Sequence, residues 1–175
     1  FDIDRGATMG YWKANYTKQA LKVQAFMNFL QGNASNLVSV DPSGNPINLE
    51  QAKKAMAAAE AEAKKNNWSM VIAILDSGGL LVMVQRLDNT QWGSIEVAKD
   101  KAYSAVAFRR STKAFSDAIA QGGAGLRLLN LTGASLIEGG VPIVVDGKVI
   151  GSIGVSGGSA PQDAQVAQAG ADAVK

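Results

Sequence analysis

Two basic residues stand where a ligand carboxylate could be bound. Arg86 ends a predicted strand, and Lys101 lies next to the apolar stripe of a predicted helix over residues 94–108. A guanidinium or an ammonium group at the mouth of a pocket binds carboxylates. The alternatives are a lysine whose stem lies along the surface, and an arginine that pairs with Asp88 or lies on a solvated rim. We predict that Arg86 and Lys101 bind a ligand.

A glycine pair stands directly before another predicted strand. The run EGGVPI begins at Glu138, so that Gly139 and Gly140 precede a strand that contains Pro142. Backbone amides at such a pair can face a ligand and stabilise an oxyanion. Any general base would have to be Glu138, Asp76 or a lysine with a perturbed pKa, since histidine is absent. The alternative is that the glycines only provide turns and close packing.

Two other carboxylates have local structural explanations. Asp76 precedes Ser-Gly-Gly in a predicted turn, where an aspartate side chain bonds to nearby backbone amides. Asp163 falls in the first turn of a predicted helix, where a negative charge is favourable.

The sequence contains no histidine and no cysteine. These two absences exclude zinc and iron–sulfur sites of the usual kind, which need imidazole or thiolate ligands. They also exclude Ser-His-Asp and Cys-His hydrolases. No catalytic residue is assigned from the sequence, and no metal site is predicted.

The charge pattern argues against a nucleic-acid partner. The 175 residues carry 17 basic and 15 acidic side chains, a net charge of +2, and no Lys/Arg run exceeds two. A nucleic-acid surface is usually more densely basic. Apolar runs such as 70–75 are far shorter than the roughly 20 residues that span a bilayer, so we predict no membrane insertion.

Periodicity and turn residues predict a regular order of elements. Asn48 with Gln51, and Ser159 with Gln162, indicate capping boxes at two helix starts, and Asp146-Gly147 indicates a hairpin turn. The segment 126–136 is ambiguous. The predicted elements are a helix at 8–31, a linker at 32–46, a helix at 48–65, strands at 68–75 and 80–86, helices at 94–108 and 112–121, strands at 141–145 and 148–155, and a helix from 159 to about 174.

Hairpins between helices indicate an α+β fold. Consecutive strands joined by short turns pair antiparallel, so we expect a mostly antiparallel sheet with helices packed on it. The connections do not suit a Rossmann fold. The elements divide the chain into an N-terminal helical arm and linker, residues 1–47, and a domain, residues 48–175.

These features together resemble the GlcG/HbpS-like haem-binding family, which includes the C-terminal domain of PduO-type corrinoid adenosyltransferases. The resemblance covers about residues 48–175 and rests on motifs in the family's order. The matching residues are Asp76-x-Gly-Gly-x-Leu81, Arg86-x-Asp88, Ala98 with Lys101-Ala102 and Ala105, Glu138-Gly-Gly-Val-Pro-Ile143, Gly151-x-x-Gly154-Val-Ser-Gly157, and Asp163.

The resemblance implies a profilin-like fold of α/β/α layers, homo-oligomers, and haem or corrinoid binding by some members. It selects as cofactor-binding residues Arg86, Lys101, Tyr103, Glu138, Gly139, Gly140 and Pro142. Haem-binding members can carry a histidine in the turn that corresponds to Asp76–Leu81, where this chain has Leu80. An axial ligand would then come from Met, Tyr, Lys or a hydroxyl oxygen, and the candidates are Met27, Met70, Met83 and Tyr103.

The leading hypothesis is a non-enzymatic accessory protein that binds a tetrapyrrole, with haem as the cofactor and a corrinoid as the alternative. A second hypothesis is an enzyme or binding protein for a small hydroxy acid or similar anion, with Arg86 and Lys101 orienting its carboxylate. A third is a structural oligomer whose ligand site has decayed.

The predicted helix at 8–31 carries more apolar side chains than one amphipathic face can bury. Since the resemblance already accounts for a complete domain from residue 48, we expect this arm to pack on another subunit of a homo-oligomer. The aromatic arm and the Phe1 start also lead us to expect a periplasmic or secreted protein, with a cytoplasmic location as the alternative.

Overall fold

The computed structural model describes residues 45–174. The predicted helix at 8–31 and most of the predicted linker lie outside these residues, so the expected arm stays a prediction. The boundary at residues 47 and 48 stays one as well.

Helix α2, Leu49–Lys65, follows from its sequence in detail. The Asn48 side chain accepts a hydrogen bond from the Gln51 amide at 2.9 Å, and the Gln51 side chain accepts one from the Asn48 amide at 3.0 Å. This reciprocal pair confirms the predicted capping box. An apolar stripe that includes Ala52 and Ala59 is buried, so the helix lies close against the rest of the domain.

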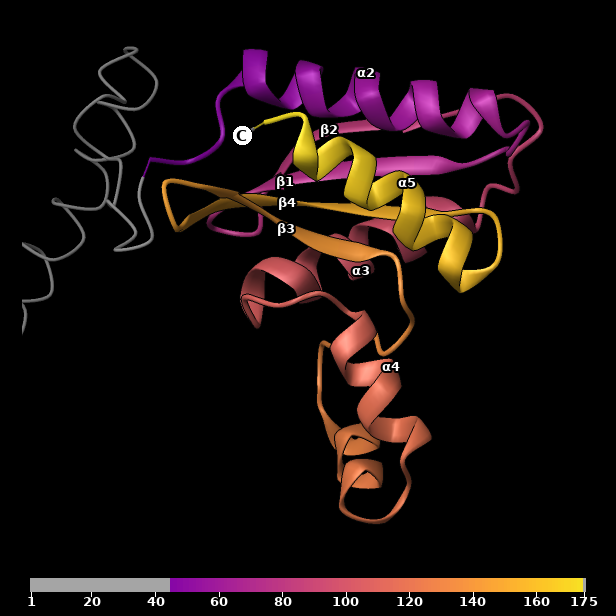
Figure 1. Cartoon of the computed structure of the whole chain (residues 1–175), viewed down its shortest axis with the longest axis vertical. Coiled ribbons are helices and arrows are strands. Elements are labelled where there is room, and N and C mark those ends of the chain that lie inside the picture. Colours follow the sequence, from indigo (N-terminus) through magenta and orange to yellow (C-terminus); the bar gives the residue numbers. More distant parts are fainter. Residues whose placement is uncertain (1–44, 175) are drawn as a thin grey trace, which may run out of the picture. The chain divides into compact units, whose positions relative to one another are not determined.

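Four strands form one antiparallel sheet in the order β2-β1-β4-β3. Both predicted hairpins are present, β1 with β2 and β3 with β4 (Figure 1). The strands are β1, Val71–Asp76; β2, Leu81–Arg86; β3, Gly140–Val145; and β4, Lys148–Ser156. Pro142 lies in the edge strand β3, where a missing amide hydrogen costs least.

Strand β1 begins three residues later than predicted. The Trp68 amide donates to the Ala63 carbonyl at 2.9 Å, and this bond closes the end of α2. Residues 68–70 therefore connect α2 to β1, and the extended strand begins only at Val71.

The remaining helices agree with the predicted ones. They are α3, Ser94–Ala107; α4, Lys113–Ala120; and α5, Ala160–Asp172, which starts with the predicted capping box of Ser159 and Gln162. The ambiguous segment 126–136 divides, because a 3-10 helix η2, Gly123–Asn130, ends inside it and irregular chain follows.

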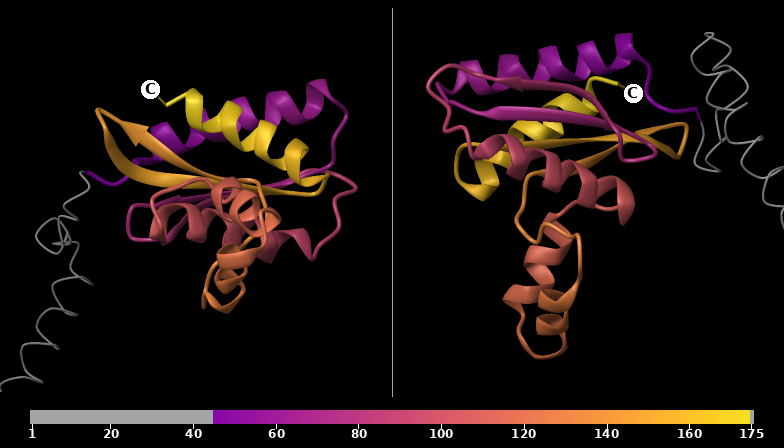
Figure 2. Two further views of the ribbon diagram at one scale, coloured as in Figure 1. Left: turned by 60° about the horizontal axis from the view of Figure 1, so that its bottom comes forward. Right: turned by 180° about the vertical axis from the view of Figure 1, so that it is seen from behind.

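The helices sandwich the sheet in three layers. Helices α2 and α5 cover one face and α3 covers the other (Figure 2). Alternation along β1 explains both cores, since Ile72 and Ile74 pack toward α2 and α5 while Ala73 and Leu75 pack with Ala98 of α3. The expected α+β fold of α/β/α layers is confirmed.

Small residues let α3 lie directly on the sheet. A side chain at Gly154 of β4 would collide with the backbone carbonyl of Ala98 and the backbone nitrogen of Ala102. This close approach brings Lys101, three residues after Ala98, to the end of β4, where it bonds to the Val155 carbonyl.

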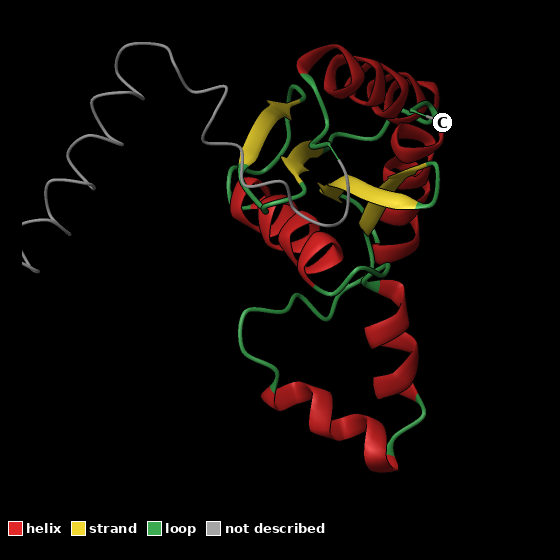
Figure 3. Cartoon of the chain, turned by 90° about the vertical axis from the view of Figure 1, so that its left-hand side faces the viewer, coloured by secondary structure: helices red, strands yellow, loops and turns green. Residues whose placement is uncertain are grey.

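Helices α4 and η2 extend away from the three layers (Figure 3). Phe115 of α4 is buried at the base of this projection, where its ring meets Phe108 edge-on at 5.4 Å between centroids. Arg110 lies over the same ring at 5.8 Å, so one aromatic cluster ties the projection to the end of α3.

Candidate functional site

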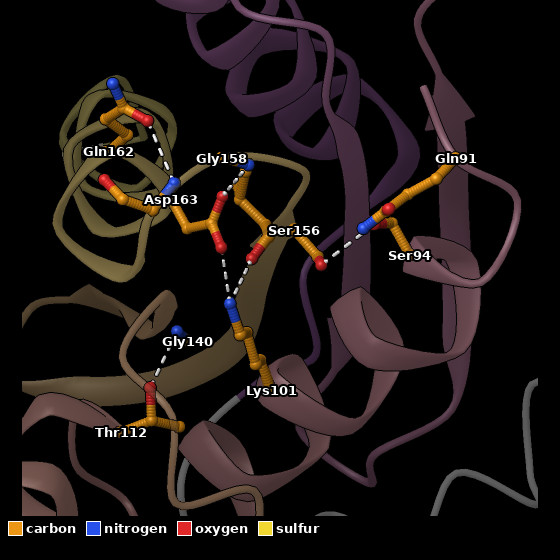
Figure 4. A network of polar contacts seen from close by, with 11 residues as sticks. Gln91, Ser94, Lys101, Thr112, Gly140, Ser156, Gly158, Gln162 and Asp163 are labelled. Atoms are coloured by element: carbon orange, nitrogen blue, oxygen red, sulfur yellow. Dashed lines mark hydrogen bonds and ion pairs between the residues drawn. The ribbon is translucent and has the colours of Figure 1, made fainter. Parts of the chain in front are cut away.

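Lys101 and Asp163 form a buried ion pair between α3 and α5. Lys101 Nζ lies 2.7 Å from Asp163 Oδ2 and donates to the Val155 carbonyl oxygen at 3.0 Å. The Gly158 amide donates to Asp163 Oδ1 at 3.0 Å, as Figure 4 shows. The Lys101 side chain is 1% exposed, so both charges are compensated inside the protein.

Burial raises the pKa of the Asp163 carboxyl above its ordinary value, while the Lys101 ammonium and the Gly158 amide act in the opposite direction. The carboxylate thus depends on Lys101 to remain charged in the interior. Asp163 is more than a charge near a helix dipole, because it joins α5 to α3.

The glycine pair at 139–140 packs directly on this ion pair. A Cβ atom at Gly139 would lie 2.9 Å from Lys101 Nζ and 2.8 Å from Asp163 Cβ, and the residue has φ of +125°. A Cβ at Gly140 would collide with the Lys101 carbonyl. Both glycines are therefore required for packing, which was the alternative weighed from the sequence.

The Gly140 amide does not face a ligand. It donates to Thr112 Oγ1 at 2.9 Å, and the Thr112 amide donates back to the Gly140 carbonyl at 3.0 Å (Figure 4). The oxyanion site expected at this amide is therefore not formed in the structure.

Lys101 likewise differs from the prediction. It is neither a surface lysine nor a cation at a pocket mouth, since its ammonium points inward to Asp163 and Val155. Any ligand carboxylate would have to displace Asp163 to reach it.

Arg86 lies at the end of the edge strand β2, two strands away from β4, whose Val155 carbonyl bonds to Lys101. Its guanidinium makes one long hydrogen bond, from Nη1 to the Thr90 carbonyl at 3.4 Å, and it lines an open cavity of about 460 Å³. Asp88 lines the same cavity but makes no ion pair with Arg86 among the described residues. Of the two sequence-based alternatives, the local Arg86–Asp88 pair is not formed, whereas the exposure of both residues agrees with a solvated rim.

Tyr103 is the surface candidate on α3. Its side chain is 47% exposed, and its ring carbons lie 3.1 Å from the position that a Cβ of Gly79 would occupy. The ring therefore lies against the β1–β2 turn, which continues directly into the exposed Leu80 and Leu81. We call Leu80, Leu81 and Tyr103 the turn patch.

Asp76 organises that turn as predicted. Its Oδ1 accepts hydrogen bonds from the amides of Gly78 and Leu80, each at 2.9 Å. The carboxylate is thus occupied in the local turn structure that the sequence indicated.

Glu138 and Pro142 lie on the β3 side of the domain. Glu138 is half-buried, and its negative charge helps to raise the pKa of Lys113 in α4, an effect led by the Asp117 carboxylate bonded to that lysine. Pro142 is half-buried within the edge strand.

The methionine candidates are core residues. Met70 is fully buried, and the half-buried Met83 packs against the same core beneath α2 and α5. Full burial leaves Met70 unable to reach a ligand, which corrects its assignment as a candidate axial ligand, whereas the assignment of the partly exposed Met83 stays a prediction. Met27 lies outside the described residues.

Within residues 45–174, no three acidic side chains gather closely enough to hold a metal ion. No helix in this part of the chain is both long and apolar enough to cross a membrane.

Comparison with known proteins places the chain in a family. A family model described as haem degrading protein HbpS-like matches residues 47–172. The chain belongs to the HbpS-like family. The resemblance drawn from the motifs between Asp76 and Asp163 is thereby confirmed.

Two relatives match over most of their own length. The chain is 38% identical over 128 residues to an uncharacterized 15.0 kDa protein from the dhaT-dhaS intergenic region of Citrobacter freundii, covering 72% of this chain and 90% of that protein. It is 40% identical over 112 residues to protein GlcG of Escherichia coli strain K12, covering 63% of this chain and 81% of GlcG.

A solved structure shares both fold and sequence. The crystal structure of a PduOC:heme complex matches with a TM-score of 0.68 and 30% identity, covering 74% of this chain and 96% of that chain.

The HbpS-like motifs of this chain do not meet in one site. Lys101, Gly139 and Gly140 lie inside, Tyr103 lies on the turn patch, and Arg86 lies at the far edge. In the strand order of the sheet, Arg86 on β2 and Gly140 on β3 are three strand spacings apart, about 14 Å.

Sequence reasoning missed most of the polar network around Lys101. Ser156 Oγ bonds to Ser94 Oγ at 3.2 Å, Gln91 Nε2 donates to Ser94 Oγ at 3.1 Å, and Thr112 is buried against Gly140 (Figure 4). Ser94 and Ser156 are 62 positions apart, and no local pattern relates them.

Proposed function

We propose that this chain is a non-enzymatic accessory protein that binds a tetrapyrrole, haem in the first place, at the turn patch. Two facts support a tetrapyrrole: membership of the HbpS-like family, and similarity to the PduOC:heme complex. The observation that carries the location is Tyr103, which is 47% exposed and lies over the β1–β2 turn.

The turn patch has the surface chemistry that a haem edge or face requires. Leu80 is 70% exposed and Leu81 is 50% exposed, so the two leucines that directly follow Gly79, the residue against which the Tyr103 ring lies, have little cover of their own. A tetrapyrrole would remove this apolar surface from water. The patch also includes the segment where the family resemblance puts a histidine in some haem-binding members.

Tyr103 is the axial ligand that the described side chains favour. Tyrosine oxygen is an established haem ligand, whereas Met70 is fully buried in the core and Met83 packs against that core. When bound, haem would supply iron chemistry, while Tyr103 would position the iron and the leucines would exclude water from one side of the ring.

Haemin titration of the full chain tests this proposal. We expect saturable binding at micromolar concentration with a shifted Soret band and no spectral signature of bis-histidine ligation. Tyr103→Phe should weaken binding at least tenfold and change the spectrum, whereas Tyr16→Phe, the same substitution elsewhere in the chain, should change neither. A parallel titration with cobalamin tests the corrinoid alternative.

Two results would overturn the proposal. The absence of saturable binding to either tetrapyrrole would remove the function. Unchanged affinity and spectrum in Tyr103→Phe would remove the turn patch as the site.

We also propose that the chain forms a homo-oligomer through the segment 8–31. The support comes from the sequence, which places Trp12, Tyr16 and Phe29 in one predicted helix before a domain with its own core. Deleting residues 1–36 should reduce the mass measured by light scattering. An unchanged assembly state and solubility would contradict this proposal.

A further inference from the structure

Arg86 differs from the lysines that the structure shows paired. Six lysines of the described chain form ion pairs with acidic side chains, whereas the guanidinium of Arg86 makes only the 3.4 Å bond to the Thr90 carbonyl. An arginine presents five N–H donors in a planar fork that matches a carboxylate. Most of its binding capacity is therefore unused.

This guanidinium lines a polar cavity at the C-terminal end of α2. The cavity of about 460 Å³ lies within the size range of small-molecule sites. It is formed by the end of α2, the exit segment before β1 and the end of β2, and its lining is Glu60, Lys64, Asn67, Trp68, Ser69, Gln85, Arg86, Leu87 and Asp88.

The charges of the cavity are of two kinds. Lys64 and Glu60 form a pair, and hydrogen bonds from Lys64 and Gln85 lower the pKa of the Glu60 carboxyl. These groups satisfy one another. Arg86 and Asp88 form no ion pair with each other among the described residues. The cavity therefore offers one available cation and one available carboxylate, two positions apart in the chain.

The apolar part of the lining is also specific. Trp68 and Leu87 are half-buried, and both pack against the core on the α2 side of the sheet. They give the cavity a fixed apolar wall next to its free charges.

We propose that this cavity binds a small zwitterion of amino-acid size. Its carboxylate pairs with Arg86, its ammonium group pairs with Asp88, and an aliphatic side chain lies against Trp68 and Leu87. A simple carboxylate would leave Asp88 without a partner, and a simple amine would leave Arg86 without one.

The site is separate from the turn patch. Arg86 and Leu81 stand at opposite ends of β2, about 17 Å apart along the strand. Failure of tetrapyrrole binding would therefore leave this inference standing, and the reverse also holds.

Three probes with the same isobutyl group test the charge requirement. Leucine carries both charges, 2-hydroxy-4-methylpentanoate lacks the ammonium group, and 3-methylbutylamine lacks the carboxylate. Each is titrated into the ¹⁵N-labelled full chain while the indole N–H signal of Trp68 is followed, with Trp68→Phe used to assign that signal. We expect saturable shifts with leucine and at least tenfold weaker binding of the other two.

Matched variants locate the site. Arg86→Gln and Asp88→Asn should each weaken leucine binding at least tenfold, and Arg127→Gln, which removes a guanidinium far along the chain on η2, should leave it unchanged. Tyr103→Phe should also leave it unchanged, which separates this site from the tetrapyrrole site.

The proposal is overturned if leucine produces no saturable shift, or if Arg86→Gln binds leucine as well as the unaltered chain does. Equal binding of the hydroxy acid overturns the zwitterion requirement, because Asp88 would then contribute nothing.

Discussion

The sequence predicts the same role for Lys101 and Arg86, ligand binding, but the structure shows one buried and the other exposed. Lys101 is 1% exposed and bonds to Asp163 and Val155, whereas Arg86 is exposed and, among residues 45–174, bonds only to Thr90. The comparison separates two uses of a cation. One holds α3 to α5 in the interior, and the other stays available at a cavity.

The same contrast occurs within two residues of α3. Lys101 faces the interior, and Tyr103 lies half exposed against the β1–β2 turn. Two positions along a helix rotate the side chain by about 200°, so neighbours in sequence serve the core and the surface. Because Lys101 is buried and ion-paired whereas Arg86 is exposed, substitutions should affect stability strongly at Lys101 and weakly at Arg86.

The largest effect is expected from Lys101→Met. The variant leaves the Asp163 carboxylate buried without its ammonium partner, which should lower the free energy of unfolding by about 3–5 kcal/mol. Urea denaturation measures this loss. The double variant Lys101→Met with Asp163→Leu, which removes both charges, should recover most of it. No recovery would show that Lys101 acts mainly by packing.

Gly140→Ala should be the next most damaging change. The new methyl group would collide with the Lys101 carbonyl and approach Thr112 Cγ2 at 2.8 Å. Overpacking of this kind costs about 1–3 kcal/mol. Gly93→Ala is the matched control, since a Cβ there meets nothing within 4 Å and neither Gly93 nor Gly140 has a positive φ. If both variants lose the same stability, collision does not explain the effect at Gly140.

The pH dependence of Lys101→Met sharpens the comparison further. Burial raises the pKa of Asp163, and without the ammonium nothing but backbone amides opposes that rise. A carboxyl with a raised folded-state pKa contributes most below its unfolded value of 3.8 and loses that contribution as the pH rises through the folded value. Stability of the variant should therefore fall with rising pH more steeply than that of the unaltered protein.

The slope can reach about 1.4 kcal/mol per pH unit within that window. Denaturation series at several pH values measure it. The double variant lacks the carboxyl and serves as the control, and an equal slope in that variant would assign the titration to another group.

The smallest effect on stability is expected from Arg86→Gln. Its side chain is exposed and has no ion-pair partner among residues 45–174, so the free energy of unfolding should change by less than about 0.5 kcal/mol. Thermal and urea unfolding provide the measurement. A loss above 1–2 kcal/mol would mean that Arg86 supports the fold, and the comparison with Lys101 would then fail.

Local sequence features were enough to predict most elements. Asn48 with Gln51 defines the start of α2, and Asp146-Gly147 forms the turn between β3 and β4, because caps and turns depend on residues only a few positions apart. The same holds for Asp76, whose bonds to Gly78 and Leu80 stay within one turn.

The site could be predicted only as a set of residue types. Motif order named Lys101, Glu138, Gly139 and Asp163 as significant, and the structure shows three of these four in mutual contact, Lys101, Gly139 and Asp163. The motif order did not indicate that these residues contact one another instead of a ligand. That distinction depends on burial, which a one-dimensional pattern does not contain.

The sequence by itself determined the family, the capped helices, the two hairpins and the absence of imidazole and thiolate ligands. These follow from short-range geometry and from composition. The tertiary structure alone decided that Lys101 meets Asp163 across 62 positions and that Arg86 stays three strands from Gly140. The packing of α3 and α5 on the sheet brings Lys101 to Asp163, and the strand order keeps Arg86 away from Gly140. Both relationships are between residues that no local interaction connects.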